Sequence, residues 1–214
     1  MELQILDCDY IMLSKPIVRI FGKNMKGETV CVFYDKFLPY FYLHSLDESK
    51  YPEIIQTLKK KFEKGIVGLD IVNRFLPIGY SEKPVKVLKI TEKDPAMTRE
   101  IREFAKEFGT LYESDILFKY RFMADFGLKG MGWIKVEGKP TKTTTVKCKP
   151  IEAEKIEPIE ILENAPLKIL ALDIECVPEE DRIAIPGKDP IVMMSLAFSQ
   201  DYKGFKNLVL LSKP

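Results

Sequence analysis

Residues 167–177 read LKILALDIECV, an aliphatic run that carries two carboxylates, Asp173 and Glu175. A proline precedes the run, and its length and aliphatic content favour a buried strand. Side chains alternate along a strand, so the two carboxylates share one face, about 7 Å apart at a rise of roughly 3.3 Å per residue. That separation allows the two carboxylates to bind hard cations between them. Burying both negative charges without a cation or a proton would be costly, which also favours a metal site.

The alternative is that the strand ends at Leu172 and that both acids are solvated, since carboxylates are usually exposed. Two further apolar segments follow the motif, at residues 191–198 (IVMMSLAF) and 208–211. Three such strands resemble the beginning of a larger domain. By themselves they would leave an apolar face of the sheet uncovered. We therefore expect this chain to be a fragment or to pack onto another polypeptide.

Composition restricts the function only weakly. The 214 residues include 33 basic and 32 acidic ones, for a net charge of +1, so any basic surface for nucleic acid has to be local. No apolar stretch is long enough to cross a membrane, and the first ten residues, with three acids and no base, predict no signal peptide. Four widely separated cysteines predict reduced thiols in a cytosolic protein, and a single histidine excludes sites that need several.

The chain before the carboxylate motif predicts an α+β fold. The opening is rich in short strands and predicts a small antiparallel barrel or curled sheet, with strands at residues 2–10, 16–21, 29–34 and 39–43.

Two helical patterns follow this opening. Pro52 starts the first, and the second begins with Asp94 as N-cap and Pro95 in the first turn. The remaining predicted elements are a third helix from near Ser114 to Phe126 and strands at 66–75 and 84–90. Their predicted order, strand-strand-helix-strand-strand-helix, resembles the ferredoxin-like type.

The segment that leads to the motif is less regular. Residues 130–136 predict a strand, and residues 139–150, rich in Lys and Thr, predict an exposed hairpin or linker. Residues 151–164 are acidic and contain prolines. We predict a domain boundary at Ala165, which gives domains 1–165 and 166–214.

Family resemblance adds what spacing does not supply. Residues 167–176 resemble the first exonuclease motif of family B DNA polymerases, and residues 190–198 resemble the next strand of that domain. The first 130 residues resemble the amino-terminal domain of archaeal members, carried by residues 5–10 (ILDCDY), 16–21 (PIVRIF), 37–42 (FLPYFY), 83–90, 94–102 and 115–125 (DILFKYRFMAD). The insertion at 130–164 is longer than in compact archaeal enzymes and is more similar to eukaryotic or divergent archaeal relatives.

The resemblance implies a template-binding domain at 1–165 and the first strands of an RNase H-like 3′–5′ exonuclease domain at 166–214. It implies that Asp173 and Glu175 are catalytic metal ligands for Mg or Mn. The whole enzyme would extend primers and proofread, whereas this stretch lacks the polymerase palm and the later exonuclease acids and is expected to be inactive alone. Implied partners are single-stranded and primer-template DNA, the rest of the polymerase chain and a sliding clamp, with no membrane. The implied location is cytoplasmic, archaeal and associated with the nucleoid.

Archaeal members have an amino-terminal pocket that captures uracil in the template and stalls synthesis. Carried over by position, it would consist of Tyr10, Pro39, Tyr40, Pro95, Thr98, Ile116, Leu117, Phe118 and Arg121. Flat apolar walls suit a flipped base, and a close wall rejects the methyl group of thymine.

The sequence departs from this pattern at two positions. Leu117 stands where many relatives have proline, and Thr98 where many have valine, which makes one wall more polar. The alternative for the whole set is that Phe118 and Tyr40 are core residues and Arg121 is a surface base.

Two other functions compete with a polymerase fragment. One is a stand-alone single-stranded nucleic-acid-binding module, based on the aromatic β-rich opening and the lysine-rich first helix. The other is a small metal-dependent nuclease that uses Asp173 and Glu175. The shortage of later acids weakens it, because after Glu180 and Asp181 the only further acids are Asp189 and Asp201.

Overall fold

The computed structural model describes residues 1–179 and 182–212. Contacts divide the chain into two compact units, Met1–Ala165 and Pro166–Pro214. The first unit combines strands and helices, and the elements of the second are strands. The mixed, strand-rich α+β class predicted from the sequence is confirmed.

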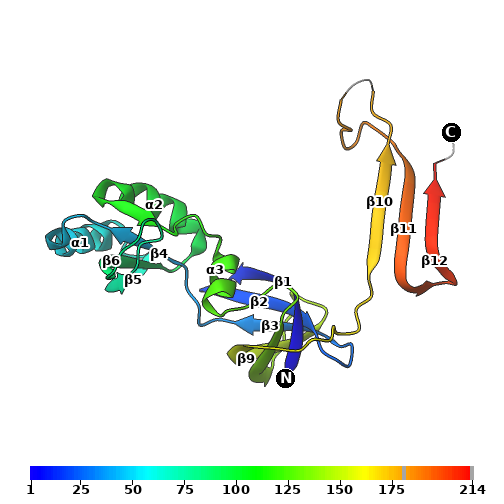
Figure 1. The fold of residues 1–214 in the computed structure, drawn as a ribbon, viewed down its shortest axis with the longest axis horizontal. Coiled ribbons are helices and arrows are strands. Elements are labelled where there is room, and N and C mark those ends of the chain that lie inside the picture. Colours follow the sequence, from blue (N-terminus) through cyan, green and yellow to red (C-terminus); the bar gives the residue numbers. More distant parts are fainter. Residues whose placement is uncertain (180–181, 213–214) are drawn as a thin grey trace. The chain divides into compact units, whose positions relative to one another are not determined.

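A closed five-stranded barrel forms one part of the first unit, in the order β1-β2-β3-β9-β8 (Figure 1). Strand β1 pairs antiparallel with both β2 and β8, and a parallel pairing of β3 with β9 closes the ring. Val18 and Ile20 of β2 are fully buried between half-buried neighbours, as expected of a strand with one face in a core. The barrel strands are β1 (Glu2–Met12), β2 (Pro16–Lys23), β3 (Thr29–Tyr34), β8 (Trp133–Pro140) and β9 (Lys149–Ile159).

Strand β9 was not predicted, because its apolar pattern changes face partway along. Ile151 and Ala153 are buried, and so is Ile156, which has the opposite parity in the sequence. A register shift between Glu137 and Gly138 in the pairing with β8 accounts for the change. A Cβ atom on Gly138 would lie 2.1 Å from a backbone oxygen of β9, so only glycine fits at this bulge.

A four-stranded sheet with the order β5-β6-β4-β7 forms the other part of the first unit. Helices α1 and α2 pack on it, and Phe41, Leu88 and Ile90 of the sheet share a core with Leu58 and Ile101 of the helices. The elements are β4 (Tyr40–His44), η1 (Glu48–Lys50), α1 (Tyr51–Lys61), β5 (Ile66–Arg74), β6 (Val85–Glu92), η2 (Pro95–Met97), α2 (Thr98–Ala105), η3 (Lys106–Phe108) and β7 (Thr110–Tyr112).

The predicted order of elements in this part was wrong. The structure has strand-helix-strand-strand-helix-strand, because β4 leaves the β-rich opening to join this sheet and β7 follows α2. The third helix, α3 (Phe118–Asp125), packs instead on the barrel core through Phe118 and Phe122. It begins later than Ser114, since Glu113 has a left-handed φ of 61° and Leu117 is extended at ψ 139°.

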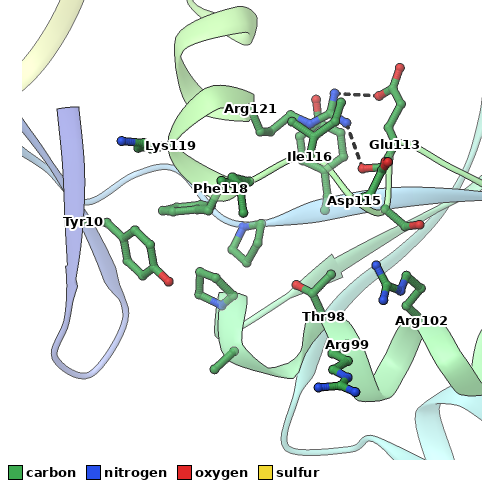
Figure 2. Close-up of a pocket in the computed structure, with 16 residues that line it drawn as sticks. Tyr10, Thr98, Arg99, Arg102, Glu113, Asp115, Ile116, Phe118, Lys119 and Arg121 are labelled. Atoms are coloured by element: carbon green, nitrogen blue, oxygen red, sulfur yellow. Dashed lines mark hydrogen bonds and ion pairs between the residues drawn. The ribbon is translucent and has the colours of Figure 1, made fainter. Parts of the chain in front are cut away.

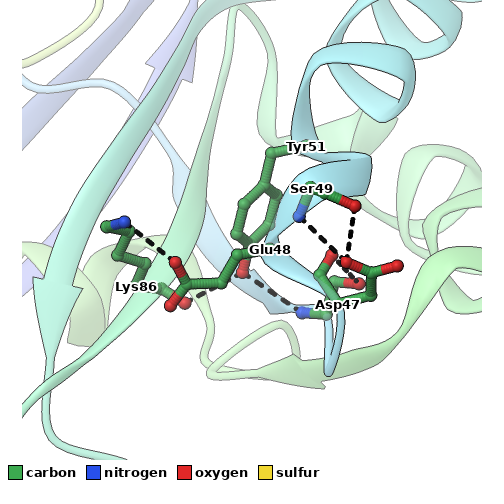
Figure 3. A network of polar contacts seen from close by, with 6 residues as sticks. Asp47, Glu48, Ser49, Tyr51 and Lys86 are labelled. Carbon is green, nitrogen blue, oxygen red and sulfur yellow. Dashed lines mark hydrogen bonds and ion pairs between the residues drawn. The ribbon is translucent and has the colours of Figure 1, made fainter.

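A polar network fixes the start of α1 against the sheet (Figure 3). The buried Tyr51 hydroxyl donates to the Lys86 carbonyl at 2.9 Å and accepts from the Ser45 amide at 3.2 Å. Asp47 caps the preceding turn by accepting from the Ser49 amide at 3.0 Å, and Lys86 pairs with Glu48 at 2.8 Å. The network therefore links the start of α1 to β6, through Lys86, and to the end of β4, through Ser45.

The end of the first unit is held by the buried side chain of Gln4 in β1. Its amide nitrogen donates to the Asn164 side chain at 2.6 Å, and its oxygen accepts from the Ala165 amide at 2.8 Å. The Trp133 indole donates to the Glu163 carbonyl at 2.9 Å. Residues 163–165 therefore belong to the barrel although they form no strand.

The second unit is an antiparallel sheet in the order β10-β11-β12. Its strands are β10 (Leu170–Cys176), β11 (Ile191–Tyr202) and β12 (Phe205–Leu211). The expectation that β10 is buried was wrong, because Leu172 is 56% exposed and Ile174 43% exposed. The sheet is the only layer in the described part of this unit, so β10 is covered on neither face. None of the described helices has the length and apolar content that a membrane span needs.

Candidate functional site

A cavity of about 410 Å³ opens in the first unit where α2, α3, β1 and the segment before β4 meet (Figure 2). All nine residues that the resemblance assigned to a uracil pocket line it: Tyr10, Pro39, Tyr40, Pro95, Thr98, Ile116, Leu117, Phe118 and Arg121. They come from four segments of the chain that are far apart in sequence. The structure thus brings the whole predicted set together in one place.

Local sequence signals position the floor of the cavity. Asp94, predicted as the N-cap of the helix, caps the turn η2 that leads into α2, by accepting from the Ala96 amide at 2.8 Å. Pro95 takes the first position of that turn, and Thr98 begins α2 directly afterwards. Across the cavity, the Pro39 carbonyl accepts from the Glu92 amide at 2.8 Å, which ties the segment before β4 to the end of β6.

Phe118 and Tyr10 form an aromatic wall. Phe118 is 6% exposed and belongs to the barrel core, where its ring lies 5.5 Å from that of Phe37. Tyr10 meets it edge to face at 5.0 Å and is 38% exposed. Phe118 is therefore both a core residue and a wall residue. Packing in the core fixes Phe118, whereas the ring of Tyr10 is partly exposed to solvent.

Arg121 braces the cavity from behind and is not a surface base. It is 7% exposed, and its guanidinium lies 2.6 Å from the Glu113 carboxylate and 4.7 Å from the centre of the Tyr40 ring. The Tyr40 hydroxyl donates to Asp125 at 2.6 Å. Burial is the main cause that raises the pKa of Tyr40, and the hydrogen bond to Asp125 raises it further. These contacts lock Tyr40, Glu113 and Arg121 into one wall.

Ile116 and Leu117 form the lip of the cavity and are 42% and 63% exposed. They lie just before α3, where the backbone of Leu117 is extended at ψ 139°. An apolar lip of this kind is suited to contact with a planar ligand that enters from solvent.

Sequence reasoning missed the cations at the rim. Arg99 and Arg102 of α2 and Lys119 of α3 also line the cavity, together with Ala96, Glu113, Ser114 and Asp115. The spacing of Arg99 and Arg102 places both on one side of a helix that begins at Thr98, which was the available signal. Cations beside a cavity with flat apolar walls are suited to phosphate groups that flank a base.

The predicted metal ligands lie in the second unit. Asp173 pairs with Ser195 and Glu175 with Met193 in the β10–β11 ladder, so both project from the same face of β10. One Asp173 oxygen accepts from the Ile174 amide at 3.1 Å. Both side chains are exposed.

Among the described residues, the later acids form no metal-binding group with this pair. Asp189 accepts two hydrogen bonds from Arg182, at 2.5 and 2.8 Å, and this pairing lowers the pKa of Asp189. Glu180 and Asp181 lie outside the described residues. Within the described residues, no group of three or more Asp, Glu, His or Cys side chains is placed to hold a metal ion.

Comparisons with known proteins identify the family that this chain resembles. A family model for the exonuclease domain of DNA polymerase family B matches residues 109–213. DNA polymerase 2 of Aeropyrum pernix is 30% identical over 92% of this chain, and the DNA polymerase delta catalytic subunit of Dictyostelium discoideum is 28% identical over 90%. These alignments span 25% and 22% of the two relatives, so the chain covers about a quarter of their length.

A solved structure supports the same assignment. The family B DNA polymerase of Pyrobaculum calidifontis matches the whole chain with a TM-score of 0.76 and 26% identity, over 27% of that polymerase. The match includes both the barrel-containing unit and the carboxylate strand. The chain is a relative of the family B DNA polymerases and corresponds to their amino-terminal and exonuclease region.

Proposed function

We propose that this chain is the amino-terminal part of a DNA-directed DNA polymerase and that its first unit binds template DNA and captures uracil. The observation that carries the proposal is the single cavity lined by all nine predicted residues. Its volume of about 410 Å³ has room for a nucleobase, and Pro39, Pro95 and Phe118 supply flat surfaces. The cations at the rim supply contacts for the flanking phosphates.

Rejection of thymine would depend on the fit of the wall to the base. Uracil and thymine differ by one methyl group, and a close-fitting apolar pocket discriminates such a difference by about 1–3 kcal/mol. The core packing of Phe118 supports a wall that does not yield to that methyl group. Tyr10 is the adjustable member and would close over the captured base.

We further propose that Asp173 and Glu175 contribute to a divalent-metal site of a 3′–5′ exonuclease. Carboxylate oxygens on one strand face are ligands that Mg²⁺ and Mn²⁺ prefer, so the pair fits part of such a site. When bound, the metal would activate water and stabilise the leaving oxygen. Since further ligands would have to come from elsewhere, the described residues by themselves provide no complete centre, and we expect no cleavage by this stretch alone.

The same proposal extends to the fold types. The strand-helix-strand-strand-helix-strand order and the sheet order β5-β6-β4-β7 support a ferredoxin-like assignment for the part that carries α1 and α2. The antiparallel β10-β11-β12 sheet is proposed as the start of an RNase H-like domain.

The competing function is single-stranded DNA binding without base preference, which Arg99, Arg102 and Lys119 favour because phosphate contacts carry no sequence information. A competition assay at one fixed salt concentration separates the two. Its single-stranded oligonucleotides differ by one uracil or thymine, and the proteins are wild type, Tyr10→Ala and Tyr120→Ala. Tyr120 is 54% exposed on α3 and does not line the cavity, so it is the matched control.

We expect a uracil preference of about tenfold in wild type, from the energy of one methyl group. Tyr10→Ala should reduce it several-fold, and Tyr120→Ala should retain it. Equal binding of both oligonucleotides by wild type would contradict uracil capture and leave the competing function.

A further inference from the structure

Behind the cavity lies a carboxylate that the proposed uracil pocket does not include. Glu92, the last residue of β6, is fully buried, with a relative exposure of 0%. Its backbone amide donates to the Pro39 carbonyl, and its carboxylate accepts from the Thr98 hydroxyl. Pro39 and Thr98 both line the cavity, whereas Glu92 does not. One buried residue thus joins two walls that come from different elements.

This position is unusual for a carboxylate. The oxygen Oε1 of Glu92 has no hydrogen-bond partner, and a buried carboxylate normally satisfies both oxygens. The charged group that acts on it is Asp94, of the same sign, and the Thr98 hydroxyl is its neutral donor from α2. Lys93, the next residue in the chain, is exposed. Burial outweighs the Thr98 hydrogen bond and, with Asp94, raises the pKa of Glu92 to about 7.

We propose that Glu92 is a positioning residue of the cavity: it holds Thr98 and Pro39 in place, and its protonation strengthens capture of a base from a DNA strand. This inference rests on the proposed function of the cavity. The Thr98 hydroxyl donates its hydrogen bond to Glu92, so Thr98 needs no hydrogen-bond partner on the ligand. The departure from valine at this position is thereby compensated within the protein.

The direction of the pH effect follows from charge. A DNA strand brings phosphates toward the cavity and removes water from it, and both changes disfavour a buried negative charge. Binding therefore favours the protonated form of Glu92 and takes up protons. By linkage, affinity rises as the pH falls through the pKa of Glu92, and it levels off once the carboxyl is neutral.

The first test measures the dissociation constant of the uracil oligonucleotide from pH 6 to pH 8 at fixed salt. We expect wild type to bind about three- to tenfold more tightly at pH 6 than at pH 8, which lies within the limit of about a hundredfold that the linkage of one proton sets over two pH units. Glu92→Gln keeps an acceptor for Thr98 but does not titrate, so its affinity should vary by less than about twofold. Glu100→Gln, which removes an exposed carboxylate from α2, should behave as wild type.

The second test addresses positioning. Glu92→Leu removes the acceptor and leaves the Thr98 hydroxyl without a partner, so uracil affinity should fall about three- to tenfold. Adding Thr98→Val to Glu92→Leu removes both polar partners, which is close to neutral in a buried pair, and should restore affinity to within about twofold of wild type. Loss of affinity without rescue in the double variant would contradict the positioning role.

The outcomes separate the two proposals. If wild type prefers uracil and Glu92→Gln keeps the pH slope of wild type, the role of Glu92 is wrong and the pocket stands. If wild type shows no uracil preference at any pH, the proposed function fails, whatever Glu92 does. Because Glu92→Gln is nearly isosteric, its result remains decisive even where Glu92→Leu does not fold.

Discussion

The cavity in the first unit and the carboxylate strand in the second were both predicted, yet they are built in opposite ways. The cavity residues come from four distant segments, and most of its walls are anchored in buried cores or ion pairs. Asp173 and Glu175 come from one continuous motif, and both side chains are exposed. A continuous motif therefore indicates the chemistry of a site but not which residues hold its side chains in place. A site built from distant segments depends on the whole fold around it.

The largest expected effect tests this difference in support. Phe122 is fully buried in the barrel core that also holds Phe118, and its ring lies 5.4 Å from that of Phe37, so Phe122→Ala should destabilise the first unit by about 3–5 kcal/mol. Leu172→Ala, at a side chain 56% exposed in β10, should cost less than about 1 kcal/mol. Urea unfolding followed by fluorescence of the single tryptophan, Trp133, monitors the first unit. For the second unit, circular dichroism of the sheet is the readout.

If Phe122→Ala and Leu172→Ala had similar small effects, the cavity would not depend on the barrel core, and the contrast between the two regions would fail.

A smaller effect concerns the buried carboxylate of the first unit. The pKa of Glu92 is raised by burial from 4.5 to about 7, so the folded state holds this proton more tightly than the unfolded state. Its contribution to stability is complete below pH 4.5 and is lost as the pH rises through 7. We expect wild type to lose about 2–3 kcal/mol of unfolding free energy from pH 4.5 to pH 8, relative to Glu92→Gln.

Urea unfolding at several pH values measures this loss. Parallel curves for wild type and Glu92→Gln would contradict a titrating Glu92. A curve for wild type that converges with that of Glu92→Gln toward acid pH would support it.

The smallest expected effect is in the second unit. Asp173→Asn changes an exposed side chain, so the free energy of unfolding should move by no more than about 0.5 kcal/mol. Millimolar Mn²⁺ should perturb the NMR signals of β10 in wild type less strongly than a complete site would, and Asp173→Asn should abolish the perturbation. A large loss of stability in Asp173→Asn would show that the carboxylate has a structural role.

Much of the fold was predictable where the signal is local. Asp94 and Pro95 indicated the start of the turn before α2, and the patterns at residues 16–21 and 84–90 indicated the strands β2 and β6. Strand β9 was missed, because the bulge at Gly138 exchanges the faces of its apolar residues and hides their period. Strand β4 was assigned to the wrong sheet, since no local pattern states which partner a strand takes.

The site divides in the same way. Its nine residues were named through family resemblance, and no periodicity in the sequence joins Tyr10 to Thr98 or Phe118. Glu92 was overlooked, because a carboxylate at the end of an alternating strand suggests solvent, and only the tertiary structure shows it buried. The burial of Arg121 and its ion pair with Glu113 were likewise visible only in the structure, because Glu113 has a left-handed backbone conformation that no sequence pattern indicates.

The hydrogen bonds of Gln4 have a consequence for how the first unit folds. They join a residue of the first strand to Asn164 and Ala165, which are 160 and 161 positions later in the chain. Contacts this distant in sequence slow folding, because the intervening chain must be ordered before they form. During synthesis, the barrel cannot complete its bonds until residue 165 has left the ribosome. The first strand made therefore obtains its last hydrogen bonds only when the end of the unit is made.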